Sequence, residues 1–237
     1  MVVLISGLNF ASYILVKTVG TEHGIGIAGL LGGLISSMAV TLGFSQRSRQ
    51  PGEDARTLAR GLLIAWTVMF FRVIIMSWVI NAALGLRLAI SLGLLCIVSL
   101  GACYWLWHGR QPERVKVEAG HNPFELDQAI KFGLLFGVVV FIAKAAQVYL
   151  GEAGLYLAAG VAGLTDVDAI TLAMADLTKL DESNINISAR AIVIAVIANT
   201  LVKSSMAASL GSPELRRVTL PISGGLFVAG IVAVLLI

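Results

Sequence analysis

GLTDVDAITL, at residues 163–172, has a second copy in GLISSMAVTL at residues 33–42, and this repetition is the main signal for the fold. Both copies consist of Gly-Leu, four variable positions, Ala, an aliphatic residue and Thr-Leu. The variable positions hold two carboxylates in the later copy and two hydroxyls in the earlier one. Both copies lie in strongly apolar regions, where a polar side chain is costly and is a candidate for function. We expect the two copies to face each other.

The step from Gly33 to Gly163 also relates the rest of the two halves without a gap, and we call this step the repeat offset. Glycines and charged residues recur at this spacing, which chance explains poorly even in so apolar a chain. We therefore predict an internal duplication, which is typical of transporters with a site at the repeat interface near the bilayer midplane. The identical pairs include Gly7/Gly137, Glu22/Glu152, Gly24/Gly154, Gly33/Gly163, Thr41/Thr171, Arg60/Arg190, Ile64/Ile194, Ala65/Ala195 and Arg87/Arg217.

The composition indicates an integral membrane protein. The chain has 237 residues, is 57% hydrophobic and 13% charged, and has a mean hydropathy of +0.89. A soluble domain is nearer about 45–50% apolar and about 25% charged. The net charge of +3 is modest and the basic residues lie mainly in loops, so we expect the lipid bilayer and no nucleic acid as a partner. Cys96 and Cys103 fit neither a metal pair nor a disulfide framework, and we expect them to be packing residues.

Spans of roughly 20 apolar residues cross a bilayer. The predicted fold is an all-α membrane protein of about eight transmembrane helices in two pseudo-symmetric four-helix repeats. The first repeat covers residues 1–108, a charged cytoplasmic linker covers 109–127, and the second repeat covers 128–237. The eight predicted spans are 1–19, 24–45, 58–80, 84–107, 128–150, 154–176, 187–210 and 215–237.

The number of crossings per half decides how the halves are related. If all four spans of each half cross the membrane, the two halves have the same orientation in it. If the second span of each half enters and leaves on the same side, only three spans cross, and the second half is inverted relative to the first. Loop charges favour eight crossings, because ten basic residues then lie on one side against four on the other, and the richer side faces the cytoplasm. Both termini are then cytoplasmic in a multi-pass inner-membrane protein. The richer side holds Arg47, Arg49, Arg56, Arg60, Arg110, Arg114, Lys116, Lys131, Lys179 and Arg190, and the poorer side holds Lys17, Arg87, Arg216 and Arg217.

Asp166 and Asp168 are the first candidates for the site. On an intact helix their side chains diverge by about 200°. They converge on one ion only if the backbone unwinds between them; otherwise they serve different partners. Asp168 and Thr171 share a face, being three positions apart. The acids would form a structural ion pair with Lys203 or Arg72, or they would coordinate an ion or relay protons; we favour the second group of roles.

Asn199 and Lys203 are four positions apart and lie on one face of a predicted span. Arg72 has nearly the same depth in the first half, because the repeat offset places it beside Lys203. Two buried cations and two buried carboxylates therefore balance formally. These four charges could form a permanent structural network of ion pairs. They could equally form a switch in which a substrate ion displaces a cation from an aspartate.

Four motifs resemble an uncharacterised bacterial membrane domain that often forms the C-terminal end of MgtC/SapB-type proteins. They are GLLGGLISSMAVT at 29–41, NPFEL at 122–126, AGLTDVDAIT at 162–171 and NTLVK at 199–203. The resemblance implies a polytopic inner-membrane protein that is sometimes attached to an MgtC-like domain. MgtC-type proteins are commonly labelled as related to magnesium transport. The resemblance singles out Ser36, Ser37, Thr41, Asp166, Asp168, Thr171, Asn199 and Lys203.

We expect a transporter or channel for a small inorganic cation, with a divalent ion such as Mg²⁺ as first choice and with Asp166 and Asp168 as metal ligands. The oxygens of Ser36, Ser37, Thr41, Thr171 and Asn199 would complete the site, and no other cofactor is expected. The first alternative is an anion or small-carboxylate transporter that uses Lys203 and Arg72. The second is a non-transporting regulatory or assembly partner for another membrane protein. With either function, an MgtC-like domain or a second copy of the chain in a homo-oligomer is the expected protein partner. An enzyme is not expected, because the chain has no HExxH motif and no nucleophile elbow.

Overall fold

The structure is a computed structural model that describes residues 22–107, 114–116, 126–180 and 184–237. Within these ranges the chain forms seven helices and one pair of short antiparallel strands. By length and composition α2, α3, α4, α7 and α8 are able to cross a membrane, which makes this a helical multi-pass membrane protein. The elements are β1 (Glu22–Gly24), α2 (Ile25–Arg47), α3 (Ala55–Ile80), α4 (Ala82–Trp107), β2 (Arg114–Lys116), α5 (Leu126–Thr165), α6 (Val167–Leu180), α7 (Ile185–Leu210) and α8 (Pro213–Leu235).

Four long helices agree with predicted spans to within a few positions: α3, α4, α7 and α8. Their turns are capped by polar side chains. Asp54 accepts hydrogen bonds from backbone N–H groups at the start of α3, and Ser212 accepts one at the start of α8. Asn81 alone separates α3 from α4, and its side-chain oxygen accepts hydrogen bonds from the first N–H groups of α4. The predicted span 1–19 lies outside the described residues.

The helix α2 does not run straight, as the predicted span 24–45 would require. Its backbone is extended at Ser36, with φ −159° and ψ 105°. A Cβ built on Gly61 would lie 2.5 Å from Phe44 and 2.8 Å from Ile25, so both ends of α2 touch one point on α3. In a straight helix these two residues would be about 28 Å apart, at about 1.5 Å per residue. The chain therefore folds back at Ser36, and we call α2 the first hairpin.

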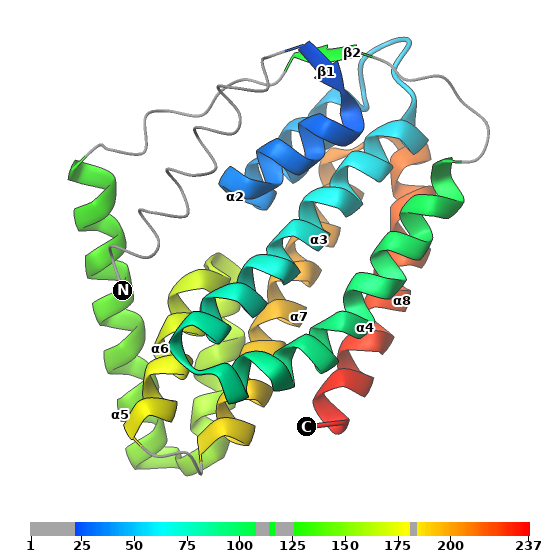
Figure 1. The fold of residues 1–237 in the computed structure, drawn as a ribbon. Coiled ribbons are helices and arrows are strands. Elements are labelled where there is room, and N and C mark those ends of the chain that lie inside the picture. The colour runs from blue at the N-terminus through cyan, green and yellow to red at the C-terminus, as the bar shows by residue number, and fades with distance from the viewer. Residues whose placement is uncertain (1–21, 108–113, 117–125, 181–183) are drawn as a thin grey trace.

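The second hairpin consists of the last part of α5, from Glu152, together with α6. Gly151 has a positive φ of 60° and ends the first part of α5, a conformation that glycine adopts readily. Asp166 is the single non-helical residue between α5 and α6. Figure 1 shows α6 running back alongside the last part of α5, and the two helices pack together. The predicted span 154–176 therefore also folds back on itself.

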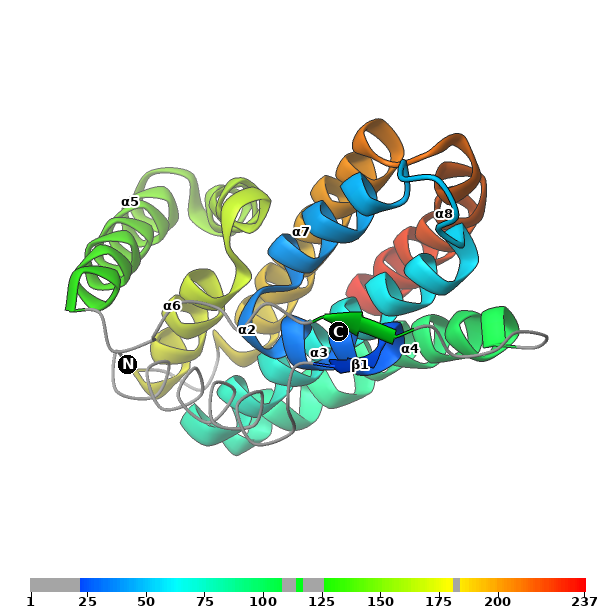
Figure 2. The ribbon, with the colours of Figure 1, turned by 90° about the horizontal axis from the view of Figure 1, so that it is seen from above.

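The two halves run in opposite directions. Figure 1 shows that α3 and α7 are antiparallel to each other, as are α4 and α8. The first hairpin enters from the upper end of that view and the second from the lower end. From above, the first part of α5 and α6 lie on one side of the molecule, α4 and α8 lie on the other, and α2, α3 and α7 lie between them (Figure 2). We call the upper end the arginine end, for Arg49, Arg56 and Arg216, and the lower end the asparagine end, for Asn81 in the α3–α4 turn.

Candidate functional site

A polar cavity of about 280 Å³ lies where the tips of the two hairpins meet. Each tip contributes the residues at its helix break, and α3 and α7 contribute the walls. Six of the nine residues predicted for the site line this cavity. The lining residues are Ile35, Ser36, Ser37, Met38, Met69, Arg72, Thr165, Asp166, Val167, Asp168 and Asn199.

Asp166 and Asp168 were expected to converge on one ion only if the helix is interrupted at this point. The backbone is indeed not helical at Asp166. One of its carboxylate oxygens accepts a hydrogen bond of 3.0 Å from the backbone N–H of Asp168. Aspartate is a favoured residue at this capping position of a helix, so Asp166 starts α6 as well as lining the cavity. The break turns both carboxylates toward one space.

Ser36 occupies the position in the first hairpin that the repeat offset makes equivalent to Asp166. Its hydroxyl accepts a hydrogen bond of 3.2 Å from the backbone N–H of Ala39, so it caps the returning part of α2. Each hairpin therefore presents a capped helix start to the cavity. The caps differ in charge, because one is a hydroxyl and the other is a carboxylate.

Arg72 of α3 links the two hairpin tips. Its Nη2 forms an ion pair with an oxygen of Asp168, and its Nη1 donates a hydrogen bond of 3.1 Å to the carbonyl oxygen of Leu34. That carbonyl lies at the end of a helical segment, where carbonyl groups lose their helical partners. The other carboxylate oxygen of Asp168 and the Nε of Arg72 are buried and have no hydrogen-bond partner among the described residues. Of the two cations that the sequence offered to Asp168, Arg72 is the one that pairs with it.

Lys203 of α7 lies behind the cavity and is fully buried. Its Nζ donates a hydrogen bond of 2.9 Å to the hydroxyl of Ser37 and contacts the sulfur of Met69 at 2.7 Å. Within the described part of the chain it forms no ion pair. Arg72 from the first half thus reaches the second hairpin, and Lys203 from the second half reaches the first hairpin.

Asn199 fixes the second tip, because its side-chain amide donates a hydrogen bond of 2.9 Å to the carbonyl oxygen of Gly163. Gly163 itself lies against α7, where an added Cβ would be only 2.4 Å from the carbonyl oxygen of Ala195. In the first half Gly33 lies against α3 in the same way, where a Cβ added to Gly33 would be only 2.7 Å from the Cα of Ala65. Glycine at both positions allows each hairpin to approach its neighbouring helix closely.

Thr41 and Thr171, the two repeated threonines, do not line the cavity. The hydroxyl of Thr41 donates to the carbonyl oxygen of Ser37 at 2.7 Å and accepts a hydrogen bond of 2.9 Å from the indole N–H of Trp66. Thr171 is fully buried, and its hydroxyl has no partner among the described residues. The residue equivalent to Trp66 in the second half is Val196, which cannot donate a side-chain hydrogen bond.

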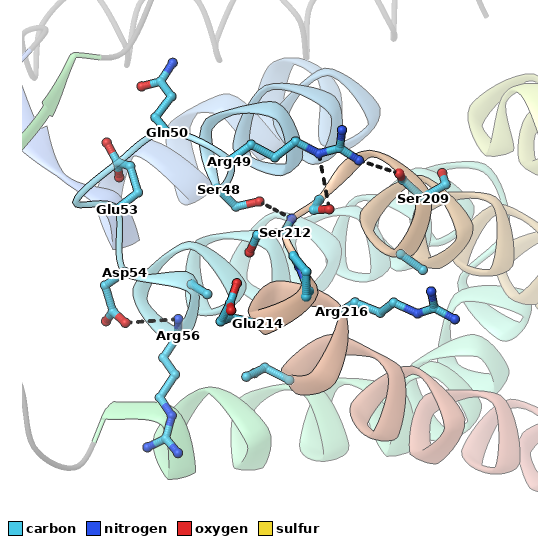
Figure 3. A pocket seen from close by; sticks show the side chains of 15 residues that line it. Ser48, Arg49, Gln50, Glu53, Asp54, Arg56, Ser209, Ser212, Glu214 and Arg216 are labelled. Carbon is cyan, nitrogen blue, oxygen red and sulfur yellow. Dashed lines mark hydrogen bonds between the residues drawn. The ribbon is translucent and has the colours of Figure 1, made fainter.

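A larger cavity of about 930 Å³, drawn in Figure 3, lies at the arginine end. It is lined by the α2–α3 loop and the α7–α8 turn, and Arg49, Arg56 and Arg216 all take part. Arg49 and Arg216 line the same cavity, so the prediction from loop charges that they lie on opposite sides of the membrane is wrong. The charge count assumed that each predicted span crosses once, which fails when two of them fold back. This cavity could not be predicted from the sequence, because its walls come from loops that are far apart in the chain.

A family model described as "Domain of unknown function (DUF4010)" matches residues 3–211. A protein of Aquifex aeolicus (strain VF5) with the name "Uncharacterized protein" is 31% identical over 192 residues. The matched region covers 80% of this chain and 84% of that protein. No solved structure matches the chain. Neither description mentions MgtC or SapB.

Proposed function

The chain belongs to the family described as domain of unknown function DUF4010, and we propose that it transports a small inorganic cation through the cavity between its hairpin tips. One observation carries this proposal: two broken helices meet at a cavity lined by charged side chains. Non-helical backbone inside a membrane is tolerated only where it is buried in protein or lines an aqueous cavity. In many secondary transporters such broken helices form the substrate site.

We further propose that the chain consists of two inverted four-helix repeats, residues 1–108 and 128–237, joined by the linker 109–127. Each repeat would hold one crossing helix, one re-entrant hairpin and two more crossing helices, which gives three crossings and inverts the second repeat. Three features support the duplication: α3 and α7 have the same length and start at equivalent positions, the hairpin breaks are related by the repeat offset, and the same Gly–Ala contact occurs in both halves.

The arginine end would face the cytoplasm of an inner membrane, because basic loop residues favour that side. In this orientation the C-terminus lies on the opposite side, which differs from the expectation that both termini are cytoplasmic. The resemblance to domains that accompany MgtC/SapB proteins supports an MgtC-like domain as a partner, and a second copy of this chain is the other candidate.

The lining residues favour a cation as the substrate. Among the described residues, Asp166 and Asp168 line the cavity together with one cation, Arg72, so the lining has a formal charge of −1, and Lys203 lies behind it on Ser37 and Met69. Asp166 forms no ion pair within the described ranges. Mg²⁺ commonly binds through one or two carboxylates and keeps several waters, which suits a cavity of about 280 Å³ with two acids. We propose that an arriving divalent cation takes the place of Arg72 on Asp168.

An anion or small carboxylate is the second candidate substrate. The buried Nε of Arg72 without a partner and the buried Lys203 without an ion pair, both among the described residues, support it. The anion would bind between these two cations. The two candidates differ in which salts stabilise the protein.

Thermal unfolding of the purified protein in a panel of salts tests both candidates, because a ligand that binds only the folded state raises the unfolding midpoint. The panel contains Mg²⁺, Mn²⁺, Ca²⁺, Na⁺, phosphate and small carboxylates, and the variant is Asp168→Asn. We expect a divalent cation to stabilise the wild type and not the variant. Stabilisation by anions alone would favour the second candidate, and no shift with any salt would contradict both.

A further inference from the structure

A pair of hydroxyl contacts holds the two halves together at opposite ends of the molecule. At the arginine end the backbone N–H of Ser212 donates a hydrogen bond of 2.8 Å to the hydroxyl of Ser48. The hydroxyl of Ser48 in turn donates to the carbonyl oxygen of Ser45 at 2.6 Å. The end of the first hairpin is thereby attached to the α7–α8 turn of the other half. We call this contact the first latch.

The asparagine end carries an equivalent contact, which we call the second latch. The side-chain amide of Asn81 donates a hydrogen bond of 3.1 Å to the hydroxyl of Thr178, and that hydroxyl donates to the carbonyl oxygen of Ala175 at 2.7 Å. The repeat offset relates Thr178 to Ser48 and Ala175 to Ser45. It also relates Asn81 to Gly211, the neighbour of Ser212. The end of the second hairpin is thus attached to the α3–α4 turn.

The first latch has an additional basic residue. Arg49 extends from the α2–α3 loop to the α7–α8 turn, as Figure 3 shows. Its Nη2 donates a hydrogen bond of 2.8 Å to the carbonyl oxygen of Ser209, and its Nε donates one of 3.3 Å to that of Gly211. Hydrogen bonds from an ionised donor are stronger than those between neutral groups. Arg49 therefore closes the contact between the halves along one side of the large cavity.

Among the described residues the second latch has the basic residue but not this interaction. Lys179 is the residue equivalent to Arg49, and its Nζ lies 3.7 Å from the carboxylate of Asp176 on its own helix. Both of these side chains are about half exposed. The carbonyl oxygens equivalent to the targets of Arg49 belong to Val79 and Asn81 in the α3–α4 turn. Within the described part of the chain, Arg49 therefore binds the other half, whereas Lys179 pairs with its own helix.

We propose that Arg49 and Lys179 are alternating gates on the two faces of the membrane, with the arginine end closed in this structure. In the opposite state Lys179 binds carbonyl oxygens of the α3–α4 turn and Arg49 releases the α7–α8 turn. The inference rests on the proposed function, because alternating access requires that one face opens while the other closes. Both latches are formed in this structure, so the two states differ in the contacts of Arg49 and Lys179, and removing one of these contacts shifts their populations.

The test measures access to the hairpin cavity from each face. A cysteine replaces Met38, which lines that cavity, after Cys96→Ala and Cys103→Ala have removed the native thiols. The protein is reconstituted in one orientation in liposomes, and a membrane-impermeant maleimide is added on one side at a time. We expect Arg49→Ala to increase the labelling rate from the arginine end about tenfold, which corresponds to about 1.4 kcal/mol, and to decrease it from the other end. Lys179→Arg should act in the same direction, because a guanidinium can bind two carbonyl groups.

Arg56→Ala is the matched control, because Arg56 lines the same cavity as Arg49 and its side chain forms no hydrogen bond to the α7–α8 turn within the described residues. Equal labelling in the wild type and in the Arg49→Ala and Lys179→Arg proteins would overturn the gates, as would equal effects of Arg49→Ala and Arg56→Ala. Size-exclusion chromatography establishes that each variant is folded. Labelling needs no substrate, so it tests the gates independently of transport. If the labelling rates change as expected but no cation flux is measured, the gates are supported and cation transport is refuted. If cation flux is measured but the labelling rates do not change, only the gates are refuted.

Discussion

Asp166→Ser is the substitution that best separates cation binding from helix capping. Asp166 caps α6 and lines the hairpin cavity, so an alanine would remove both functions at once. Serine keeps the cap, because the first hairpin already uses Ser36 at the equivalent position. Serine and aspartate are about equally good N-caps. Asp166→Ser therefore removes the charge and retains the local structure.

The two expected effects differ in size. The free energy of unfolding of Asp166→Ser should stay within about 0.5 kcal/mol of the wild type, whereas Asp166→Ala should lose about 1 kcal/mol with the cap. A divalent cation and a carboxylate about 4 Å apart attract each other by about 8 kcal/mol at an effective dielectric constant of about 20. If the serine hydroxyl and the waters on the ion recover two thirds of this, about 2.7 kcal/mol is lost, and Mg²⁺ binding weakens by about a hundredfold.

Calorimetric titration of Mg²⁺ into the purified protein measures the affinity, and thermal unfolding measures stability. Flux into liposomes that contain a Mg²⁺-sensitive dye reports transport by the same variants. Ser36→Asp, which adds a carboxylate at the equivalent cap, is the reciprocal variant and should bind Mg²⁺ at least as tightly as the wild type. Binding and transport of Mg²⁺ by Asp166→Ser at the level of the wild type would refute a role of Asp166 as a ligand, because Asp166 would then act only as a cap.

Two further predictions concern stability. Thr41→Val should destabilise the protein by about 1–3 kcal/mol, because it leaves the buried indole N–H of Trp66 without a hydrogen-bond acceptor. Thr171→Val should be neutral or stabilising, because the hydroxyl of Thr171 has no partner among the described residues. Thermal unfolding of the two variants in detergent compares them, and equal losses would contradict this account. Gly163→Ala should lower the free energy of unfolding by about 1–3 kcal/mol, because the added Cβ would lie 2.4 Å from the carbonyl oxygen of Ala195. Chemical denaturation measures this change, and an unchanged free energy of unfolding would contradict the close approach of Gly163 to α7.

Most of the candidate site could be predicted from the sequence, since polar side chains are rare in apolar spans and carry a strong signal. Ser36, Asp166 and Asp168 were found in this way and all three line the cavity. Thr41 was predicted by the same argument and instead accepts a hydrogen bond from Trp66, because polarity does not reveal which partner a side chain meets. The carbonyl groups of Leu34 and Gly163 were missed, because backbone atoms occur in every residue and leave no trace in a sequence.

The membrane class of the protein follows from the sequence alone, and the spacing of its residues predicts a correspondence between its two halves, because composition and spacing are properties of the chain. The reversal of α2 at Ser36 is visible only in the folded protein. An apolar stretch of 23 residues is able to cross a bilayer or to form a hairpin, and contacts with Gly61 from both of its ends select the hairpin. The count of loop charges failed for the same reason. A basic residue can be assigned to one face of the membrane only after the path of every preceding helix is known, and that path depends on packing between segments far apart in the chain.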